Sequence, residues 1–160
     1  MRLPRLAPLA ACLLVPLLAP LLAPVAARAR TVIGSVNTNF RWLGPDDKVV
    51  VERYDDPAIQ GVSCYVSRAE TGGMKGLVGL ATDPSRFSIA CRQTGPITVP
   101  ADLAKKQLVF SASAAPLFKA LHVWRIIDRQ KQVLVYLVIS TKLVHGSPYN
   151  SLSAVAYGPR

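Results

Sequence analysis

Apolar residues recur at every second position, or in unbroken runs, through most of the chain after residue 30. This spacing is typical of β-strands, because successive side chains of a strand point to opposite faces of a sheet. No long segment repeats its apolar residues at helical spacing. The pattern therefore predicts a mainly β fold: one antiparallel sandwich or barrel-like domain over residues 30–160, with at most one or two short helices.

Turn-forming residues divide the first half of this domain. A strand at 32–36 leads into Phe40 and Trp42, and Gly, Pro and Asp at 44–47 predict a turn. The next strand covers 48–54 and ends at Asp55-Asp56-Pro57, where aspartate can bind nearby backbone amides and proline cannot extend a central strand.

The clearest hairpin of the chain joins residues 119–128 to 132–140 through Arg129-Gln130-Lys131. Its second arm is apolar on both faces, which predicts a strand in the middle of a covered sheet. One short helix is expected at 101–106 after Pro100. Asp102 favours the N-terminal end of a helix there, and Lys105 and Lys106 favour the C-terminal end.

The first 29 residues have the three-part layout of a secretory signal. Arg2 and Arg5 precede an apolar stretch, which ends at Ala27-Arg28-Ala29. We expect cleavage after Ala29, with Ala27 as the other candidate, and no transmembrane segment afterwards. A retained membrane helix is the alternative, disfavoured by internal prolines. An acylated Cys12 in a lipoprotein box is another alternative, disfavoured because most of the apolar stretch follows that cysteine.

The basic excess of the chain is scattered. Its net charge is +10, and removal of the leader's three arginines leaves 16 basic and 9 acidic residues, about +7. The only adjacent basic pair after the leader is Lys105-Lys106. This distribution disfavours nucleic acid and favours weak attraction to an anionic envelope surface or an acidic partner.

Two cysteines remain after the leader, Cys64 and Cys91, both in predicted strands at 62–66 and 87–92. An even number of cysteines in an exported chain predicts a disulfide, which would close a loop of about 28 residues and add roughly 3–4 kcal/mol of stability. A redox pair or thiolate nucleophile is the alternative. It is disfavoured because redox pairs usually have C-x-x-C spacing.

A glycine-rich loop contains Gly72, Gly73, Lys75 and Gly76. Backbone amides of such a loop and the lysine charge can bind an anion. The loop lacks the Walker spacing, and glycines that allow a wide connection explain the same residues.

Two acidic pairs lie at opposite ends of one predicted strand, Asp46-Asp47 and Asp55-Asp56. Paired carboxylates can bind a hard cation or transfer protons, but turn formation explains both pairs and the strand keeps them apart. Asp55 and Asp56 also form a possible polar pocket with Ser147 and Asn150, although structural turns are the favoured explanation of these residues.

His122 and His145 are the only histidines. His122 shares a predicted strand face with Ala120, Trp124 and Ile126, which favours a packed or rim position over a ligand. No G-x-S-x-G motif supplies a nucleophilic serine, and no spacing indicates a metal site or a cofactor site.

Several short segments together resemble the CreA family of exported bacterial proteins. The resemblance runs in order from about residue 33 to 155, and it is specific as a set rather than by any single motif. The segments are Ile33-Gly-Ser-Val, Gly44-Pro-Asp-Asp-Lys-Val-Val-Val-Glu, Asp55-Asp-Pro, Cys64-Tyr-Val-Ser-Arg-Ala, Thr71-Gly-Gly-Met-Lys-Gly, Cys91-Arg-Gln-Thr-Gly-Pro-Ile, Phe118-Lys and Gly146-Ser-Pro-Tyr-Asn-Ser.

The resemblance implies a periplasmic envelope protein of Gram-negative bacteria with an association with carbon catabolite regulation, and it supplies no catalytic residues. Our leading hypothesis is a non-enzymatic binding or interaction module whose partner is an envelope protein or an anionic surface. The alternative is a small periplasmic enzyme that uses Asp55 or Asp56 with His122 or His145.

Overall fold

The computed structural model describes residues 30–74, 82–115, 119–141 and 145–158. The expected leader at 1–29, and Lys75 and Gly76 of the glycine-rich loop, lie outside the described residues. No helix in the described ranges is long and apolar enough to cross a membrane.

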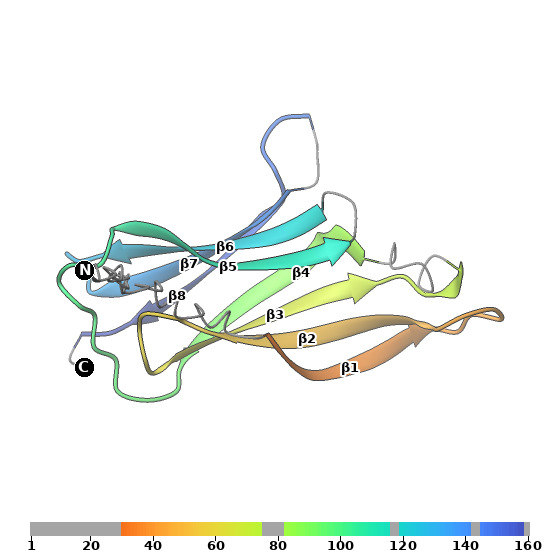
Figure 1. Cartoon of the computed structure of the whole chain (residues 1–160), viewed down its shortest axis with the longest axis horizontal. Coiled ribbons are helices and arrows are strands. Elements are labelled where there is room, and N and C mark those ends of the chain that lie inside the picture. The colour runs from red at the N-terminus through yellow and green to blue at the C-terminus, as the bar shows by residue number, and fades with distance from the viewer. Residues whose placement is uncertain (1–29, 75–81, 116–118, 142–144, 159–160) are drawn as a thin grey trace, which may run out of the picture.

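The described chain forms two antiparallel sheets of four strands each, so the expected mainly β fold is confirmed as a sandwich (Figure 1). Sheet A has the order β1-β2-β3-β4 and sheet B the order β5-β6-β7-β8. The strands are β1 (Thr31–Asn39), β2 (Asp47–Asp55), β3 (Val62–Glu70), β4 (Thr82–Gln93), β5 (Lys106–Ala115), β6 (Lys119–Asp128), β7 (Val133–Ser140) and β8 (Asn150–Ala156).

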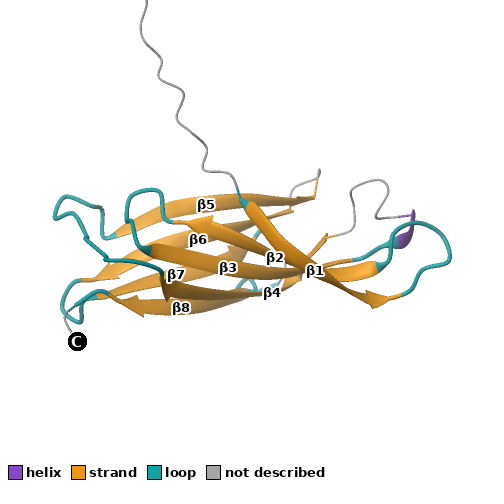
Figure 2. Cartoon of the chain, turned by 90° about the horizontal axis from the view of Figure 1, so that it is seen from below, coloured by secondary structure: helices purple, strands orange, loops and turns teal. Residues whose placement is uncertain are grey.

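The two sheets face each other along only part of their width. At one side β4 lies against β8, and the Cys91 N–H donates to Ser153 Oγ at 2.8 Å. At the other side, the Tyr54 ring of β2 packs on Phe110 of β5, the edge strand of sheet B, with ring centroids 5.0 Å apart. Strand β1 lies beyond this contact. The end of the β1–β2 hairpin also reaches past sheet B in both views (Figures 1 and 2).

The alternation read from the sequence appears directly in the burial of the strands. In β7, Leu134, Tyr136 and Val138 are buried between the sheets, while the residues between them are half-buried on the outer face. The predicted hairpin pairs β6 with β7 in continuous register from Leu121 to Asp128. The apolar character of both faces therefore marks a central strand, as expected, although only the inner face is fully covered.

The helix expected at 101–106 is wrong. Residues 101–103 form a turn, and Lys106 begins β5 opposite Ile126. The Arg129 side chain donates to the backbone oxygens of Pro100, Ala101 and Leu103 at 3.3, 3.0 and 3.1 Å. Tertiary contacts thus bind carbonyls that a helix would use, and helix propensity over so few residues is too weak to compete.

Candidate functional site

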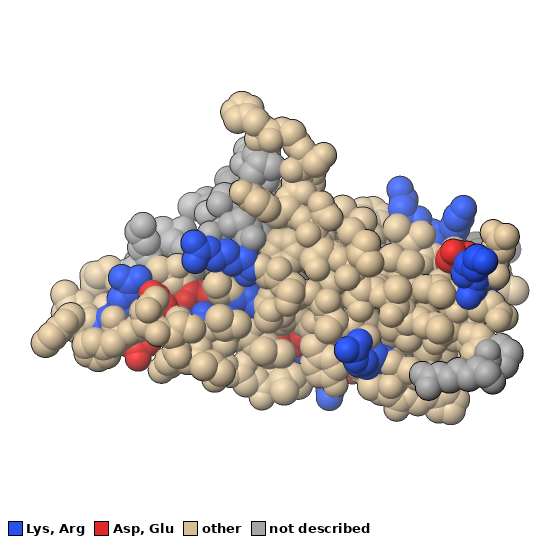
Figure 3. Space-filling view, turned by 180° about the vertical axis from the view of Figure 1, so that it is seen from behind, with Lys and Arg blue, Asp and Glu red and all other residues tan. Residues whose placement is uncertain are grey.

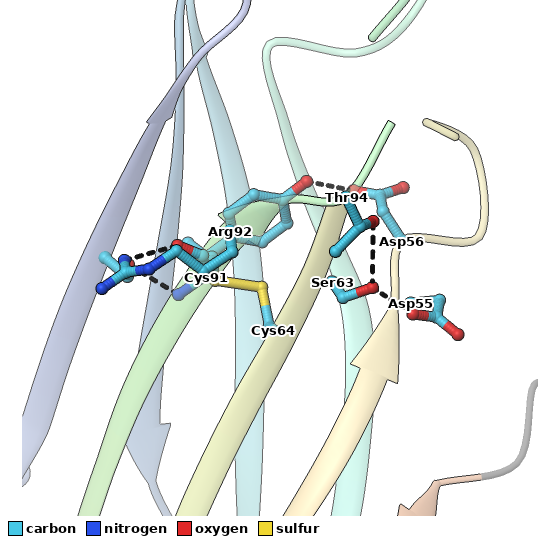
Figure 4. The surroundings of a disulfide bond; sticks show 9 residues. Asp55, Asp56, Ser63, Cys64, Cys91, Arg92 and Thr94 are labelled. Atoms are coloured by element: carbon cyan, nitrogen blue, oxygen red, sulfur yellow. Dashed lines mark hydrogen bonds between the residues drawn. A yellow bond between two sulfur atoms is a disulfide. The ribbon is translucent and has the colours of Figure 1, made fainter. Parts of the chain in front are cut away.

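The expected disulfide joins Cys64 of β3 to Cys91 of β4 (Figure 4). The two residues are directly opposite each other in the strand pair, and both are buried. The bond therefore fastens two neighbouring strands inside the core, which is the position of a structural disulfide rather than of a reactive thiol pair.

Asp56 is buried between the sheets and binds both of them. Its Oδ1 accepts hydrogen bonds from the backbone N–H groups of Ala58 and Ile59 at 2.8 and 3.0 Å, and from Arg125 Nη1 at 2.6 Å. Its Oδ2 accepts the Tyr136 hydroxyl at 2.7 Å. Asp56 thus links the 56–62 turn of sheet A to the two central strands of sheet B.

The surroundings of the cluster keep the Tyr136 hydroxyl protonated. Burial raises the pKa of Tyr136, and the negative charge of Asp56 raises it further. Arg125 has no exposed surface, and its other terminal nitrogen donates to Gln107 Oε1 at 2.7 Å. The side chain of Asp56 is fully buried, and its two oxygens accept hydrogen bonds from four donors.

A second buried cluster lies within sheet A, around Glu52. The Glu52 carboxylate accepts hydrogen bonds from Arg68 Nη2 at 2.8 Å and from the Tyr54 hydroxyl at 2.6 Å. Burial alone would raise the pKa of Glu52, but the hydrogen bonds from Arg68 and Tyr54 outweigh it and hold the pKa below its ordinary value. Arg68 also pairs with Glu70. These polar groups line the inner face of the sheet, where alternation places Glu52 and Tyr54 beside Val50.

Asp55 borders a shallow depression at the 55–63 turn. Its Oδ1 accepts the Ser63 hydroxyl at 2.6 Å, and Ser63 Oγ lies 3.3 Å from Thr94 Oγ1 (Figure 4). The depression has a volume of about 450 Å³. Ser147 and Asn150 do not line it. Asn150 begins β8 opposite Ile139, is exposed and lies on the outer face of sheet B, whereas Asp56 is buried between the sheets.

The structure does not bring the histidines to the aspartates. His122 lies on the half-buried outer face of β6, between residues whose side chains are buried on the inner face, and His145 is exposed in the β7–β8 connection. Over the described part of the chain, no ion pair joins either imidazole to a carboxylate, and no group of three or more His, Cys, Asp or Glu residues could hold a metal ion. Among the described residues, neither Asp55 nor Asp56 is therefore paired with His122 or His145, as the alternative enzyme would require.

The glycine-rich loop binds a carboxylate of the chain itself. The Gly72 N–H donates to Asp47 Oδ1 at 2.7 Å, and the Gly73 N–H donates to Pro45 O at 2.7 Å. Arg41 donates to both oxygens of Asp47, at 3.0 and 2.7 Å. These hydrogen bonds, the one from Arg41 above all, hold the pKa of Asp47 at about 2. The two glycine amides are therefore used to attach this loop to the β1–β2 turn.

The attached turn presents its apolar side chains to solvent. We call Phe40, Trp42 and Leu43 the hairpin tip; they are 72%, 92% and 72% exposed. The Phe40 and Trp42 rings pack edge to face with centroids 5.9 Å apart. Below them, the Arg41 N–H donates to Asp46 Oδ1 at 2.9 Å. The tip is therefore an ordered apolar surface on a braced turn, and exposed apolar surface of this kind is typical of interaction sites.

A broad groove adjoins the base of the same hairpin. It has a volume of about 710 Å³ and mixed charge, with Lys48, Arg68 and Arg86 beside Asp47 and Glu70. Lys48 and Glu70 pair across it at 3.3 Å. The groove is open, and its lining is both polar and apolar, with Val49, Ala69 and Phe87 among the lining residues.

Sequence reasoning missed both the hairpin tip and Arg125. The sequence did carry a signal for Arg125. Arg125 alternates with its neighbours so that it shares a strand face with Leu121, Val123 and Ile127, and a strand that buries those side chains must bury the guanidinium as well. For the tip, the available signal was two aromatic residues and a leucine immediately before a Gly-Pro-Asp-Asp turn, where side chains seldom find a core.

Comparison with known proteins identifies the family of the chain. The family profile described as CreA protein matches residues 33–159. The chain belongs to the CreA family. Protein CreA of Escherichia coli strain K12 is 47% identical over 131 residues, which cover 79% of this chain and 83% of that protein. Protein CreA of Escherichia coli O157:H7 matches with the same values. No solved structure matches the chain.

The CreA match confirms the resemblance seen in the sequence. It also covers every side chain described above, from the hairpin tip to the Arg125 cluster. Because the relatives span nearly the same length, the two sheets and the hairpin belong to the part of the chain that defines the family.

Proposed function

We propose that this CreA-family chain is an exported, non-enzymatic binding module of the Gram-negative periplasm, and that its hairpin tip is the contact surface for a partner protein. The observation that carries this proposal is the ordered, exposed tip formed by Phe40, Trp42 and Leu43. The family association with carbon catabolite regulation would then act through the bound protein rather than through a reaction at this chain.

The chemistry of the tip favours a protein over an anionic surface. Exposed aromatic side chains are frequent anchors of protein interfaces, because they bury large areas at low entropic cost. Two carboxylates, Asp46 and Asp47, lie directly beneath the tip, and Arg41 is already paired with Asp47. The basic side chains seen on the face in Figure 3 are scattered, so this face offers no single basic patch to phosphate groups.

A capture experiment tests the contact surface. Wild-type protein and a Trp42→Ser/Leu43→Ser variant are immobilised and exposed to envelope extract of the host, and the retained proteins are quantified by mass spectrometry. Leu152→Ser is the matched control, because Leu152 is an exposed leucine on the outer face of sheet B.

We expect at least one protein to be retained by wild type and the control, and to bind the tip variant at least about tenfold less, as for aromatic anchors of interfaces. Equal retention by all three proteins would contradict the assignment. Binding to anionic phospholipid vesicles without any tip-dependent protein would also contradict it.

Export is tested separately. Mass spectrometry of protein recovered from the periplasmic fraction should show a mature chain that begins at Arg30. Recovery from the cytoplasm with the leader intact would exclude the periplasmic proposal but leave the contact surface in place.

A further inference from the structure

The first strand of the described chain has no layer over either of its faces. All nine residues of β1 are exposed. Sheet B ends opposite β2, where Tyr54 packs on Phe110 of the edge strand β5, so no strand of sheet B lies opposite β1. Strand β1 is held to the rest of the molecule by its pairing with β2 and by little else.

The exposed apolar side chains are concentrated on this strand and the turn after it. Of the ten large apolar residues that the structure shows as exposed, six lie within residues 32–43, and Val32, Ile33 and Val36 belong to β1 itself. A strand that packs on nothing loses the burial that normally stabilises a sheet. Valine and isoleucine, rather than polar residues, nevertheless occupy these positions.

The outer edge of β1 also lacks the charged residues and prolines that commonly prevent strand pairing. Natural edge strands carry lysine, proline or inward-pointing charges that prevent another strand from adding to the sheet. Residues 31–39 contain no charged residue and no proline. Irregularities in the pairing with β2 fall on either side of residues 34–37, and the register is regular between them. The stretch 34–37 in the middle of β1 is thus an uncharged sheet edge in regular register with β2.

We propose that β1 pairs antiparallel with β1 of a second copy of this chain, about a two-fold axis near Ser35 and Val36. In such a pair, each residue near the axis lies opposite itself or its neighbour, so any charge there would face the same charge. The uncharged composition of β1 meets this requirement of self-pairing, which an unrelated partner would not impose. The product is one continuous sheet made from both copies of sheet A.

The dimer goes beyond the proposed function and does not rest on it. Antiparallel pairing points the two β1–β2 hairpins in opposite directions, so each hairpin tip lies at one end of the joined sheet. The dimer would then offer two copies of the partner surface and increase avidity for a bivalent partner.

Sedimentation of the purified protein, expressed from its full-length gene, tests this inference. We expect wild type to be dimeric in the micromolar range. Val36→Lys should raise the dissociation constant about a hundredfold, because like charges close together at an interface cost several kcal/mol. Val36 is 69% exposed, so the substitution leaves the fold intact, and circular dichroism confirms this. Leu152→Lys, at a position that is 62% exposed and away from β1, should sediment like wild type.

Variants with one cysteine added to the Cys64–Cys91 pair locate the axis. Among Gly34→Cys, Ser35→Cys and Val36→Cys, the residue nearest the axis should form a disulfide-linked dimer on mild oxidation, while Ser147→Cys in the exposed β7–β8 connection should form no disulfide between copies. A wild type that is monomeric throughout the micromolar range would overturn the inference. So would a dimer that Val36→Lys leaves intact. Neither result affects capture of a partner protein by the hairpin tip.

Discussion

Arg125 shows how single residues join the two sheets of this molecule. Its guanidinium is fully buried and pairs with Asp56 Oδ1 at 2.6 Å, across a sequence separation of 69 residues. Burying two ions costs hydration free energy, and the attraction between the ions offsets that cost only while both partners are present. The cluster therefore stabilises the relative placement of the sheets as long as it is complete.

Removal of Arg125 should be costly for this reason. We expect Arg125→Met to lower the free energy of unfolding by about 3–5 kcal/mol, since it leaves the Asp56 carboxylate buried without its cation. Urea denaturation followed by circular dichroism measures the change. The matched control is Arg92→Met, because Arg92 is exposed and donates only to the adjacent Cys91 carbonyl; its effect should stay within about 0.5 kcal/mol. Similar losses for both variants would disprove a special role for the buried pair.

Asp47 gives a residue-scale prediction that depends on pH. Its pKa is about 2 in the folded protein and about 3.9 in an unfolded chain, so the folded state stabilises the charged form. That contribution is present above about pH 4 and is lost as the pH falls toward 2. Asp47→Asn should therefore be less stable than wild type near neutral pH, with a difference that shrinks below about pH 4. Urea midpoints along a pH series measure this difference, and a constant gap would contradict the assignment.

At the scale of elements, the hairpin depends on contact between two loops. The Gly72 backbone lies so close to the β1–β2 turn that a Cβ atom at this position would be 1.8 Å from Pro45 O. Gly72 and Gly73 donate from here to Asp47 and Pro45. The glycines of this loop are thus required for close backbone approach, in addition to any freedom they give the chain.

Substitution of these glycines tests the contact. Gly72→Ala should lower the free energy of unfolding by about 1–3 kcal/mol, because backbone has to move to admit the methyl group. Gly95→Ala is the control, since a Cβ atom at Gly95 would make only an ordinary contact, 3.6 Å from Gly61 Cα, and its effect should stay within about 0.5 kcal/mol. Thermal unfolding compares the two variants, and equal shifts would rule out the close contact as the cause.

The periodicity of the sequence was sufficient to predict the strands, but not to predict how the strands assemble into two packed sheets. The alternation in β2 and β7 is a local property, so it identified both elements and the hairpin of β6 with β7. The helix expected at 101–106 failed because Arg129, from a different element, binds its carbonyls. The Asp56–Arg125 contact was missed because alternation does not show which faces of two sheets meet.

At the scale of the whole molecule, the offset between the two sheets decides which surfaces are available. Sheet B covers β2, β3 and β4, and leaves β1 and the hairpin tip outside the sandwich. Phe40 and Trp42 are apolar, so composition alone would place them in the core. They are exposed because no element of sheet B reaches them. The offset leaves β1 free for a second copy and the tip free for a partner protein.

Site-specific photo-crosslinking in growing cells tests the central claim, that the hairpin tip contacts a partner protein, most directly. A photoreactive amino acid replaces Trp42 in one strain and Leu152 in another, and adducts are identified by mass spectrometry after irradiation. We predict a discrete adduct with a different protein from position 42 and none from position 152. The absence of an adduct from position 42, or the same adduct from both positions, would contradict the account.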